Sequence, residues 1–297
     1  SILLMEEISP YVGTPKDADV VVVFESATLA WDAVSLTKKK KKKKVKKDEV
    51  SPADKLLPKP VVQLHTEVLF GIDLSIKKGE LLAVCGGVGA GKSSFISALL
   101  GHMRLHSGQV NVRGSCAYVG QQAWILNTSF KENILLDEPF DAKRYYRAIH
   151  ACNLSQDIGS LPAGDLTEIG ERGINLSGGQ KQRLSLARAL YADKDVYLLD
   201  DPLSAVDTHV GNHIFQWLIR GALRDKTTVF VTHQLQYLPQ CARILYLRDG
   251  CIAELGTHLE LMEDDKEYAS LYRQHMDTVA TEDKVGHGTS HPLKDYD

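Results

Sequence analysis

Short apolar runs bounded by glycine or polar residues recur along the chain and predict the strands of a sheet. Two of them, Val196–Leu199 and Val229–Thr232, are continuous rather than alternating, which is typical of central strands covered on both faces. Asp249-Gly250, between the alternating arms of Ile244–Leu255, is a strong hairpin signal. Two further strands are predicted at Leu81–Cys85 and Cys116–Val119.

The N-terminal part of the chain carries patterns that favour antiparallel pairing. We expect Val20–Phe24 and Ala27–Trp31 to form a pair of strands, and strand structure to resume at Val68–Ile76. A turn is expected at Ser107-Gly108, followed by a strand at Gln109–Val112.

Helical spacing predicts the other main elements. Directly after the glycine-rich stretch that follows Leu81–Cys85, residues 93–100 carry apolar side chains at the intervals of one helix face. The pattern is helical again over residues 128–160, and a further helix is expected to end at Tyr191. We expect these elements to belong to an α/β fold.

The glycine-rich stretch between the strand Leu81–Cys85 and its helix fits G-x-x-x-x-G-K-[ST], the phosphate-binding loop. Glycines let backbone N–H groups close on phosphate oxygens, and the helix dipole favours negative charge there. The amine of Lys92 is expected to reach the outer phosphates, and the hydroxyl of Ser93 to bind Mg²⁺. This strand–loop–helix context favours a phosphate site over a plain glycine-rich turn. The stretch consists of Gly86, Gly87, Val88, Gly89, Ala90, Gly91, Lys92 and Ser93.

Two more patterns complete the candidate chemistry. Asp200 follows an apolar strand, where a carboxylate at the strand's C-terminal edge helps to hold Mg²⁺. Ser177 and Gln180 fit a capping box at a helix start, but a cap does not require Gly178 and Gly179, which cost roughly 1 kcal/mol each in a helix. Two glycines at a helix N-terminus expose N–H groups and make a second anion site. Unless the chain folds the two sites together, the second serves a nucleotide held by another domain.

Composition narrows the class of protein. The length of 297 residues and the hydrophobic share of 43% fit one large globular domain or two small ones. Five scattered cysteines form neither a C-x-x-C pair nor a disulfide framework, so we expect a reducing, cytosolic setting. No run approaches the ~20 apolar residues of a membrane helix, and nothing resembles a signal peptide. Because the chain begins at Ser1 rather than Met, we expect it to be a fragment of something longer.

Charge is distributed unevenly along the chain. The net charge is −3, but residues 38–47 contain nine lysines, so the rest carries about −12. An acidic body argues against nucleic acid as the main partner. We expect residues 37–60 to be a solvated, disordered insertion, because they hold too little apolar surface to offset their ordering entropy. Contact with anionic lipid head groups is the alternative, and nuclear import fits the composition alone. Residues 1–19 are expected to be a linker, and residues 277–297 a flexible tail.

Taken in order, these motifs resemble the nucleotide-binding domain of ATP-binding cassette (ABC) transporters over residues 20–276. The resemblance implies a P-loop NTPase core with an N-terminal antiparallel β subdomain and an α-helical subdomain over residues 128–177. Thr167–Gly173 and Tyr118–Ile125 resemble the first nucleotide-binding domain of the C subfamily, the multidrug resistance-associated proteins. Thr232–Leu238 and Gly211–Phe215 look closest to the short members typified by multidrug resistance-associated protein 5, which also resemble this chain in their long charged insertion.

The resemblance assigns roles that the patterns leave open. Trp31, which periodicity alone would place in the core, matches the aromatic residue that stacks on adenine. Gln121 matches the glutamine that senses Mg²⁺ and the membrane-domain contact, and His233 the histidine that touches the γ-phosphate. Leu176–Gln180 is similar to the family signature, and Ser204–Asp207 to the loop that crosses the dimer interface. The implied ATP site comprises Trp31, the loop from Gly86 to Ser94, Gln121, Asp200 and His233, with Ser93, Gln121 and Asp200 as Mg²⁺ ligands.

Two positions depart from the family pattern. Gly120 stands where relatives usually have proline, so we expect a looser approach to Gln121. Asp201 occupies the position of the glutamate that acts as base or positions the attacking water. An aspartate is one methylene shorter, and a misplacement of about 1 Å can cost ~10²-fold in rate. The resemblance therefore implies a site that binds ATP and cleaves it slowly, with Asp201, His233, Lys92 and Gln121 as the catalytic set.

The implied function is that of the cytosolic first nucleotide-binding domain of an ABC exporter of organic anions or conjugates. Its partners would be a second nucleotide-binding domain, paired head-to-tail, and the transmembrane domains of the same transporter in the plasma membrane or an organelle. Ser177–Gln180 would close over the partner's ATP. Two alternatives stay open. A DNA-handling ATPase would place a long coiled coil between residues 94 and 176, where no sustained heptads occur. A regulatory ATP sensor without useful turnover is kept open by Asp201.

Overall fold

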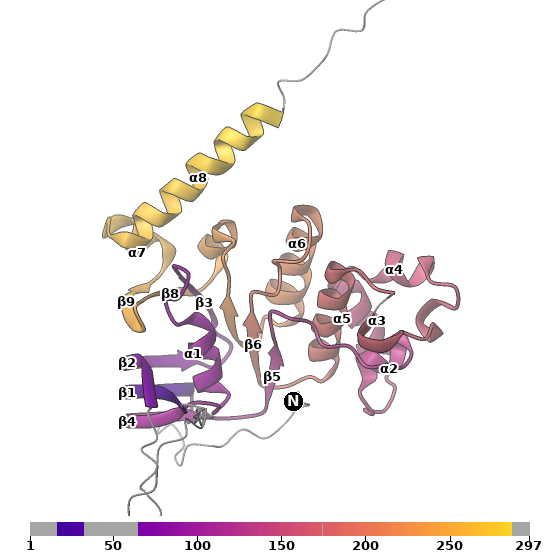
Figure 1. Cartoon of the computed structure of the whole chain (residues 1–297), viewed down its shortest axis with the longest axis horizontal. Coiled ribbons are helices and arrows are strands. Elements are labelled where there is room, and N and C mark those ends of the chain that lie inside the picture. The colour runs from indigo at the N-terminus through magenta and orange to yellow at the C-terminus, as the bar shows by residue number, and fades with distance from the viewer. Residues whose placement is uncertain (1–16, 33–64, 174, 287–297) are drawn as a thin grey trace, which may run out of the picture.

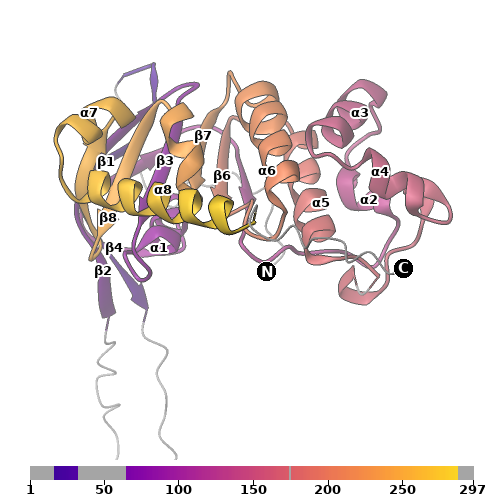
Figure 2. The same ribbon diagram turned by 90° about the horizontal axis from the view of Figure 1, so that it is seen from above.

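The structure is a computed structural model that describes residues 17–32, 65–173 and 175–286. The lysine-rich insertion predicted over residues 37–60, most of the linker predicted over residues 1–19, and residues 287–297 lie outside the described residues. The described part has two sheets and a group of helices, arranged as Figures 1 and 2 show.

The smaller sheet is antiparallel, as predicted, and has the strand order β2-β1-β4. Its strands are β1 (Val20–Asp32), β2 (His65–Lys77) and β4 (Arg104–Val112). The prediction that Val20–Phe24 and Ala27–Trp31 pair with each other is wrong, because they are two halves of one strand. Both halves pair with β2 on one side and β4 on the other.

One irregularity accounts for two differences from the predicted pattern in this sheet: β1 continues past Ser26, and Gly108 lies inside a strand. β1 changes register between Phe24 and Ala27, where Ser26 has a φ of 46°. Gly108, which we expected in a turn, lies inside β4 opposite this irregularity with a φ of 81°. A Cβ atom at Gly108 would lie 2.3 Å from the Ser26 carbonyl oxygen, so the glycine lets the distorted strands pair closely.

The larger sheet has the order β5-β6-β7-β3-β8-β9 and is parallel except for its last pair. The predicted strands and the predicted hairpin are confirmed, and β6 and β7 are buried along their whole length as expected for central strands. The strands are β3 (Leu81–Gly86), β5 (Cys116–Val119), β6 (Val196–Asp200), β7 (Thr227–Val231), β8 (Arg243–Arg248) and β9 (Cys251–Gly256).

Helix α1 (Lys92–Leu99) joins the two sheets through one hydrophobic cluster. Phe95 of α1 stacks on Phe24 of β1 with ring centroids 5.3 Å apart. The same cluster contains Leu82 and Val84 of β3, so α1 is packed against both sheets. The start of this helix is therefore held from two sides.

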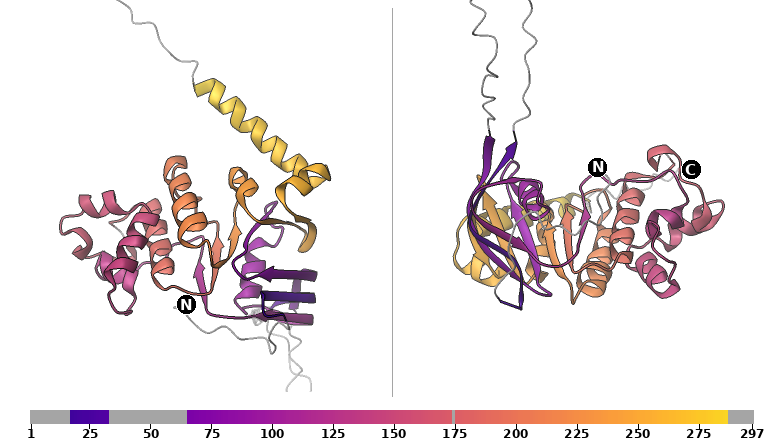
Figure 3. Two further views of the ribbon diagram at one scale, coloured as in Figure 1. Left: turned by 180° about the vertical axis from the view of Figure 1, so that it is seen from behind. Right: turned by 90° about the horizontal axis from the view of Figure 1, so that it is seen from below.

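A second hydrophobic cluster contains residues of the helices and of the larger sheet. The predicted helical stretch over residues 128–160 is broken into short helices, and α5 packs against α2 and α3. Figures 1 and 3 show these helices at the end of the molecule away from the three-stranded sheet. The elements are α2 (Phe130–Leu135), α3 (Ala142–Ala151), α4 (Ser155–Ser160), η2 (Gly164–Leu166), η3 (Glu171–Gly173) and α5 (Gly178–Tyr191).

The C-terminal third adds helices around the larger sheet. We expected a tail from residue 277, but α8 is helical as far as Gly286 and runs out from the body in Figures 1 and 3. No helix of the described residues, this 20-residue helix included, is both long and apolar enough to cross a membrane. The elements are α6 (Thr208–Ile214), the π-helical η4 (Phe215–Ala222), η5 (Leu235–Gln240), α7 (His258–Glu263) and α8 (Glu267–Gly286).

The β8–β9 hairpin turn is hydrogen-bonded to the glycine-rich loop. Asp249 and Gly250 both have positive φ, at 49° and 76°. The Gly250 N–H donates to the Ala90 carbonyl at 3.1 Å, and the Gly250 carbonyl accepts from the Phe70 N–H at 3.0 Å. A Cβ atom at Gly250 would lie 1.9 Å from the Val68 carbonyl oxygen. The turn therefore ties the loop to the smaller sheet and requires glycine.

Gly250→Ala is expected to lower the free energy of unfolding by at least about 2 kcal/mol, because it combines a left-handed φ with a backbone clash. Gly159→Ala is the matched control: Gly159 lies in α4 with no atom near its added Cβ, so the change should be neutral or stabilising by up to ~1 kcal/mol. Urea denaturation of both variants measures the difference. Equal stability of the two would contradict this account of the turn.

Candidate nucleotide-binding site

The glycine-rich loop follows β3 directly and leads into α1, as its pattern predicts. Three of its glycines have positive φ: 145° at Gly86, 81° at Gly89 and 102° at Gly91. A Cβ atom at Gly86 would lie 2.2 Å from the Leu247 carbonyl oxygen of β8. Side chains at these positions would prevent the tight curvature, so the loop conformation depends on glycine.

Lys92 turns back over this loop instead of extending into solvent. Its Nζ donates to the carbonyls of Gly86 at 2.9 Å and Gly87 at 2.8 Å. Burial lowers the pKa of Lys92, and the negative charges of Asp201 and Asp200 are among the groups that oppose this shift. The loop therefore encloses a positive charge next to two carboxylates, in the position expected for contact with outer phosphates.

Ser93 and Asp200 face each other across this site. The Ser93 hydroxyl donates to Asp200 Oδ1 at 3.5 Å. Burial raises the pKa of Asp200 and the neighbouring carboxylate of Asp201 raises it further, while Ser93 lowers it. A hydroxyl and a buried carboxylate are hard oxygen donors that suit Mg²⁺, and a cation there would offset the cost of burying the charge. The two residues thus fit the expected metal, which supplies neutralisation of phosphate charge when bound.

Gln121 lies two residues beyond β5, whose Val119 pairs with Leu199 of β6. This register brings Gln121 level with the end of β6, but its side chain is exposed. Among the hydrogen bonds of the described residues, none joins Gln121 to Ser93 or Asp200. The space that a side chain at residue 120 would enter is partly filled, since a Cβ atom on Gly120 would lie 3.0 Å from the Tyr118 hydroxyl.

Asp201 and His233 come together at the ends of adjacent parallel strands. The Asp201 N–H donates to the Val231 carbonyl at 3.0 Å, and the His233 N–H approaches Asp201 Oδ1 at 3.5 Å. Asp201 is buried and has a φ of 49°, a left-handed conformation that aspartate tolerates better than most residues. Strand ends therefore place both residues at the same C-terminal edge as Lys92 and Asp200, where ligands bind in α/β sheets.

Trp31 is located near the end of β1, close to the start of α1. It is 38% exposed, and its Nε1–H donates to the hydroxyl of Ser94 at 3.3 Å. Core packing, the role that periodicity alone suggests, does not fit this exposure. The indole ring instead lies beside the glycine-rich loop, with the Ser94 bond fixing its edge.

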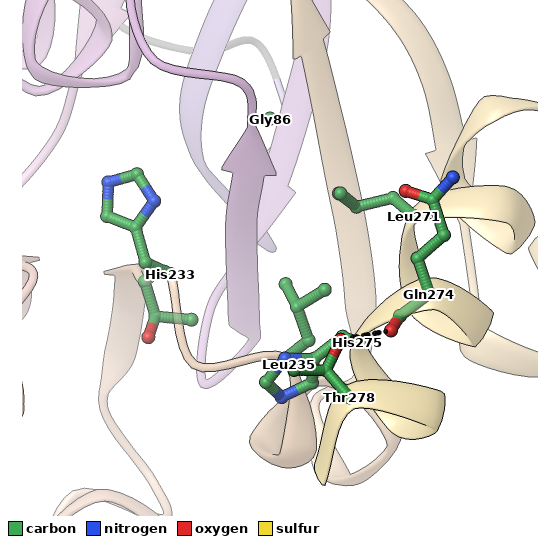
Figure 4. Close-up of a pocket in the computed structure, with 8 residues that line it drawn as sticks. Gly86, His233, Leu235, Leu271, Gln274, His275 and Thr278 are labelled. Carbon is green, nitrogen blue, oxygen red and sulfur yellow. Dashed lines mark hydrogen bonds between the residues drawn. The ribbon is translucent and has the colours of Figure 1, made fainter. Parts of the chain in front are cut away.

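A cavity of about 250 Å³ lies between the C-terminal ends of β3 and β7 and helix α8 (Figure 4). Figure 4 shows the imidazole ring of His233 directed away from the α8 side chains on the opposite wall. The Nε2 atom of His275 is buried and has no hydrogen-bond partner among the described residues. The cavity is lined by Gly86, Thr232, His233 and Leu235, and by Leu271, Gln274, His275 and Thr278 of α8.

The second glycine pair lies at the start of α5 and has the predicted capping box. The Ser177 hydroxyl accepts from the Gln180 N–H at 3.2 Å, while Gln180 Oε1 accepts from the Ser177 N–H at 2.8 Å. Gln180 Nε2 donates to Asp157 of α4 at 2.9 Å. Both polar atoms of the Gln180 side chain are thus engaged within the chain, which makes Gln180 a support of the helix start.

Gly178 and Gly179 differ in their surroundings. A Cβ atom at Gly179 would lie 3.0 Å from the carbonyl oxygen of Ala205, so the predicted interface loop 204–207 packs against the helix start. Among the described residues, no atom lies within 4 Å of the corresponding position at Gly178. Gly179 therefore has a structural reason within the chain, whereas Gly178 leaves the helix N-terminus open from outside.

The structure keeps the two glycine-rich helix starts apart. α1 follows β3, while α5 packs against the edge strand β5, and β6 and β7 lie between β3 and β5 in the sheet. Figures 1 and 2 agree in placing β6 between α1 and α5. Residues 86–94, 200, 201 and 233 therefore gather in one place, and residues 177–180 do not join them.

Several supporting residues escape sequence analysis. Asp157 forms an ion pair with Arg183, with Oδ2 2.5 Å from Nη1, in addition to its bond with Gln180. Arg188 of α5 is buried and bonds to residues far away in sequence. An acidic residue on a short helix and an arginine among apolar residues give no local signal of these contacts. Gly250 is different, since its hairpin pattern predicts the turn although not its contact with the loop.

Comparison with known proteins gives a consistent assignment. Residues 69–204 match the ABC transporter family. The chain is 53% identical over 209 residues, 70% of its length, to ATP-binding cassette sub-family C member 3 of Rattus norvegicus. It is 52% identical over 207 residues, 69% of its length, to sub-family C member 2 of Mus musculus, and 49% identical over 216 residues, 73% of its length, to ABC transporter C family member 13 of Oryza sativa subsp. indica. The chain spans only 14%, 13% and 14% of these three relatives.

The cysteine beside the loop yields a prediction about reactivity. Burial raises the pKa of Cys85 and of Cys241 to about 12 and that of Cys116 to about 11, whereas Cys251 is exposed. Thiolate is the reactive form, so at pH 8 the raised pKa values should slow alkylation of the buried thiols by roughly two orders of magnitude or more. We expect iodoacetamide to label Cys251 in the native protein, and the others only after unfolding, as followed by peptide mass spectrometry. Native labelling of Cys85 at the rate of Cys251 would contradict the buried site.

Proposed function

The chain contains a nucleotide-binding domain of the ABC transporter family, of the C-subfamily type, and we propose that it binds Mg-ATP and works as one of two ATP-binding domains of an exporter. The observation that carries this proposal is the convergence of Lys92, Ser93 and Asp200 around a loop whose curvature depends on glycine. This arrangement supplies backbone N–H groups, one enclosed amine and a pair of oxygen donors to a Mg-triphosphate.

Each remaining site residue has a place in this proposal. The face of Trp31 stacks on the adenine base, and the Ser94 hydroxyl holds the indole edge. Gln121, whose exposed side chain stands beyond the end of β5, turns toward Mg²⁺ when nucleotide is bound. His233 touches the γ-phosphate from the end of β7, beside Asp201.

The second glycine pair supports pairing with another nucleotide-binding domain. Residues 177–180 are separated from the chain's own loop by two strands of the sheet, so they serve a nucleotide from outside. We infer that the backbone N–H of Gly178 and the hydroxyl of Ser177 are the donors offered, while Gln180 keeps the helix start in place. A head-to-tail pair buries one ATP at each such junction, and the loop at residues 204–207 lies at the same surface.

We infer slow hydrolysis at the chain's own site from Asp201. Its carboxylate lies one methylene back from where a glutamate would end, and its backbone is fixed by the bonds to Val231 and Ser204. The chain cannot shift this residue forward without breaking them. The same feature favours the second candidate function, a regulatory domain that senses ATP without useful turnover.

The wider role rests on the relatives, of which this chain spans about one seventh. We propose that the domain is the first of two, that it belongs to the type of multidrug resistance-associated protein 5, and that it acts on the cytosolic face of a membrane. Its closure with the second domain would drive membrane domains that export organic anions or conjugates.

Trp31→Ala is expected to weaken Mg-ATP binding by about five- to fiftyfold, because a base loses its stacking partner, with little change in thermal stability. Trp31→Phe should retain most of the affinity. Trp217→Ala is the matched control, since Trp217 is 55% exposed and packs on His150, away from the loop. Isothermal titration calorimetry measures all three. An unchanged dissociation constant in Trp31→Ala would remove Trp31 from the nucleotide site.

Asp201→Glu is expected to raise steady-state ATP turnover by roughly tenfold or more when the second nucleotide-binding domain is present, because the carboxylate regains its reach. Asp201→Asn should not show this gain. A phosphate-release assay on matched preparations, with nucleotide affinity measured separately, makes the comparison. If Asp201→Glu binds Mg-ATP normally and turns over no faster, the regulatory alternative is favoured over a positioning defect.

A further inference from the structure

Tyr118 of β5 lies on the face of the larger sheet that carries the residues proposed to hold the cation. It pairs with Leu198 of β6 and packs against the hydrophobic cluster that contains Leu198 and residues of α1. Successive side chains of a strand point to opposite faces, so Asp200, two residues beyond Leu198, lies on this face as well. The hydrogen bond from Ser93 of α1 to Asp200 agrees with this orientation. Tyr118 and Asp200 therefore share one face on adjacent strands.

The phenol ring of Tyr118 extends along its strand toward the C-terminal edge of the sheet. A Cβ atom on Gly120 would lie 3.0 Å from the hydroxyl oxygen, 3.3 Å from Cζ and 3.4 Å from Cε1 of Tyr118, so the hydroxyl lies beside residue 120. The pairing of Val119 with Leu199 brings residue 120 level with Asp200 on the adjacent strand. Adjacent strands are about 4.8 Å apart, which puts the hydroxyl near the Asp200 carboxylate.

The electrostatics and the hydrogen bonding of the two groups agree with this proximity. Burial raises the pKa of Tyr118, and the negative charge of Asp200 raises it further. The Tyr118 hydroxyl forms no hydrogen bond with any other described residue. Asp200 is buried, and among the described residues its carboxylate accepts from one side chain, at Oδ1 from Ser93. Since a carboxylate has about four acceptor positions, an unused donor lies beside an acceptor with spare capacity.

We propose that Tyr118 is a positioning residue of the magnesium site, whose hydroxyl donates to the Asp200 carboxylate and keeps it in the orientation that the cation requires. The inference rests on the proposed function, in which Asp200 helps to hold the Mg²⁺ of Mg-ATP. Carboxylates that ligate a metal are in turn hydrogen-bonded, and loss of such a partner typically costs about 10- to 100-fold in metal affinity. Tyr118 acts through Asp200 and touches neither the nucleotide nor the ion.

Gly120 supplies the space that this hydroxyl occupies. Its φ is not among the positive values of the described glycines, so its backbone conformation does not require glycine. A methyl group at residue 120 would come within 3.0 Å of the Tyr118 hydroxyl, and the end of that side chain would have to move away. Gly120→Ala thus displaces the hydroxyl, whereas Tyr118→Phe removes it and keeps the ring. The two variants change one contact from opposite sides.

Tyr246 provides a matched control on the same sheet. It lies in β8 and belongs to the other hydrophobic cluster, on the opposite face from Tyr118. Tyr246→Phe therefore removes a tyrosine hydroxyl from the sheet without touching the magnesium site. A change seen with Tyr118→Phe and absent in Tyr246→Phe reports the contact with Asp200.

The test is the affinity of the full chain for ATP, measured by isothermal titration calorimetry in excess Mg²⁺ and again in excess EDTA. The ratio of the two dissociation constants is the gain that Mg²⁺ gives, and it should be equal in the wild type and in Tyr246→Phe. In Tyr118→Phe this gain should fall about fivefold or more, while the affinity in EDTA changes less than about twofold. Gly120→Ala should lower the gain as well. The double variant should match Tyr118→Phe, because the methyl group then has no hydroxyl to displace.

The outcomes separate the two proposals. A wild type that binds ATP in neither buffer overturns the proposed function and this inference with it. ATP binding in which Mg²⁺ gives the wild type no gain, an undiminished gain in Tyr118→Phe, or equal losses of affinity in both buffers overturns the inference alone. So does a double variant in which the two losses add, since the hydroxyl and residue 120 would then act separately. If Tyr118→Phe does not fold, Gly120→Ala decides the result, because it leaves the phenol in the chain.

Discussion

The closing of a short backbone loop around one amine is the constraint on which the rest of the structure depends. Lys92 bonds to carbonyls of the loop that it belongs to, and the loop takes this curvature only because Gly86, Gly89 and Gly91 adopt positive φ. The surroundings maintain this shape: the Leu247 carbonyl limits one side, and the turn at Gly250 supports the other. The two sheets and the helix between them thus hold the conformation of this short loop.

Burial and charge are balanced at this site in a way that suits a charged ligand. Lys92, Asp200 and Asp201 are all withdrawn from water, and burial is the main cause of the shifted pKa values of Lys92 and Asp200. Burying a charged group alone costs free energy, and a partner of opposite charge offsets this cost. A triphosphate carries negative charge to the amine, and its cation carries positive charge to the carboxylates, so the complex relieves both.

Local signals explain what the sequence analysis predicts well. The strand at Cys116–Val119, the hairpin at Asp249-Gly250 and the capping box at Ser177 depend on neighbours within a few residues, and the structure confirms them. The unbroken course of β1 past Ser26 depends on Gly108, over eighty positions along the chain, and was not predictable from alternation. The fixation of the segment after Gln121 by Arg188 is equally remote. Pairing across the fold, rather than propensity, decides such features.

The surroundings of Gly178 distinguish what folding requires of this residue from what association with a second domain would require. Its backbone φ is not in the left-handed region, and an added Cβ atom would meet no atom of the described residues within 4 Å. The contacts of the described residues therefore do not require glycine at this position, and we expect Gly178→Ala to change thermal or chemical denaturation little. In the proposed pair of nucleotide-binding domains, such a replacement would instead weaken association, so its effect would be measured only when the second domain is present.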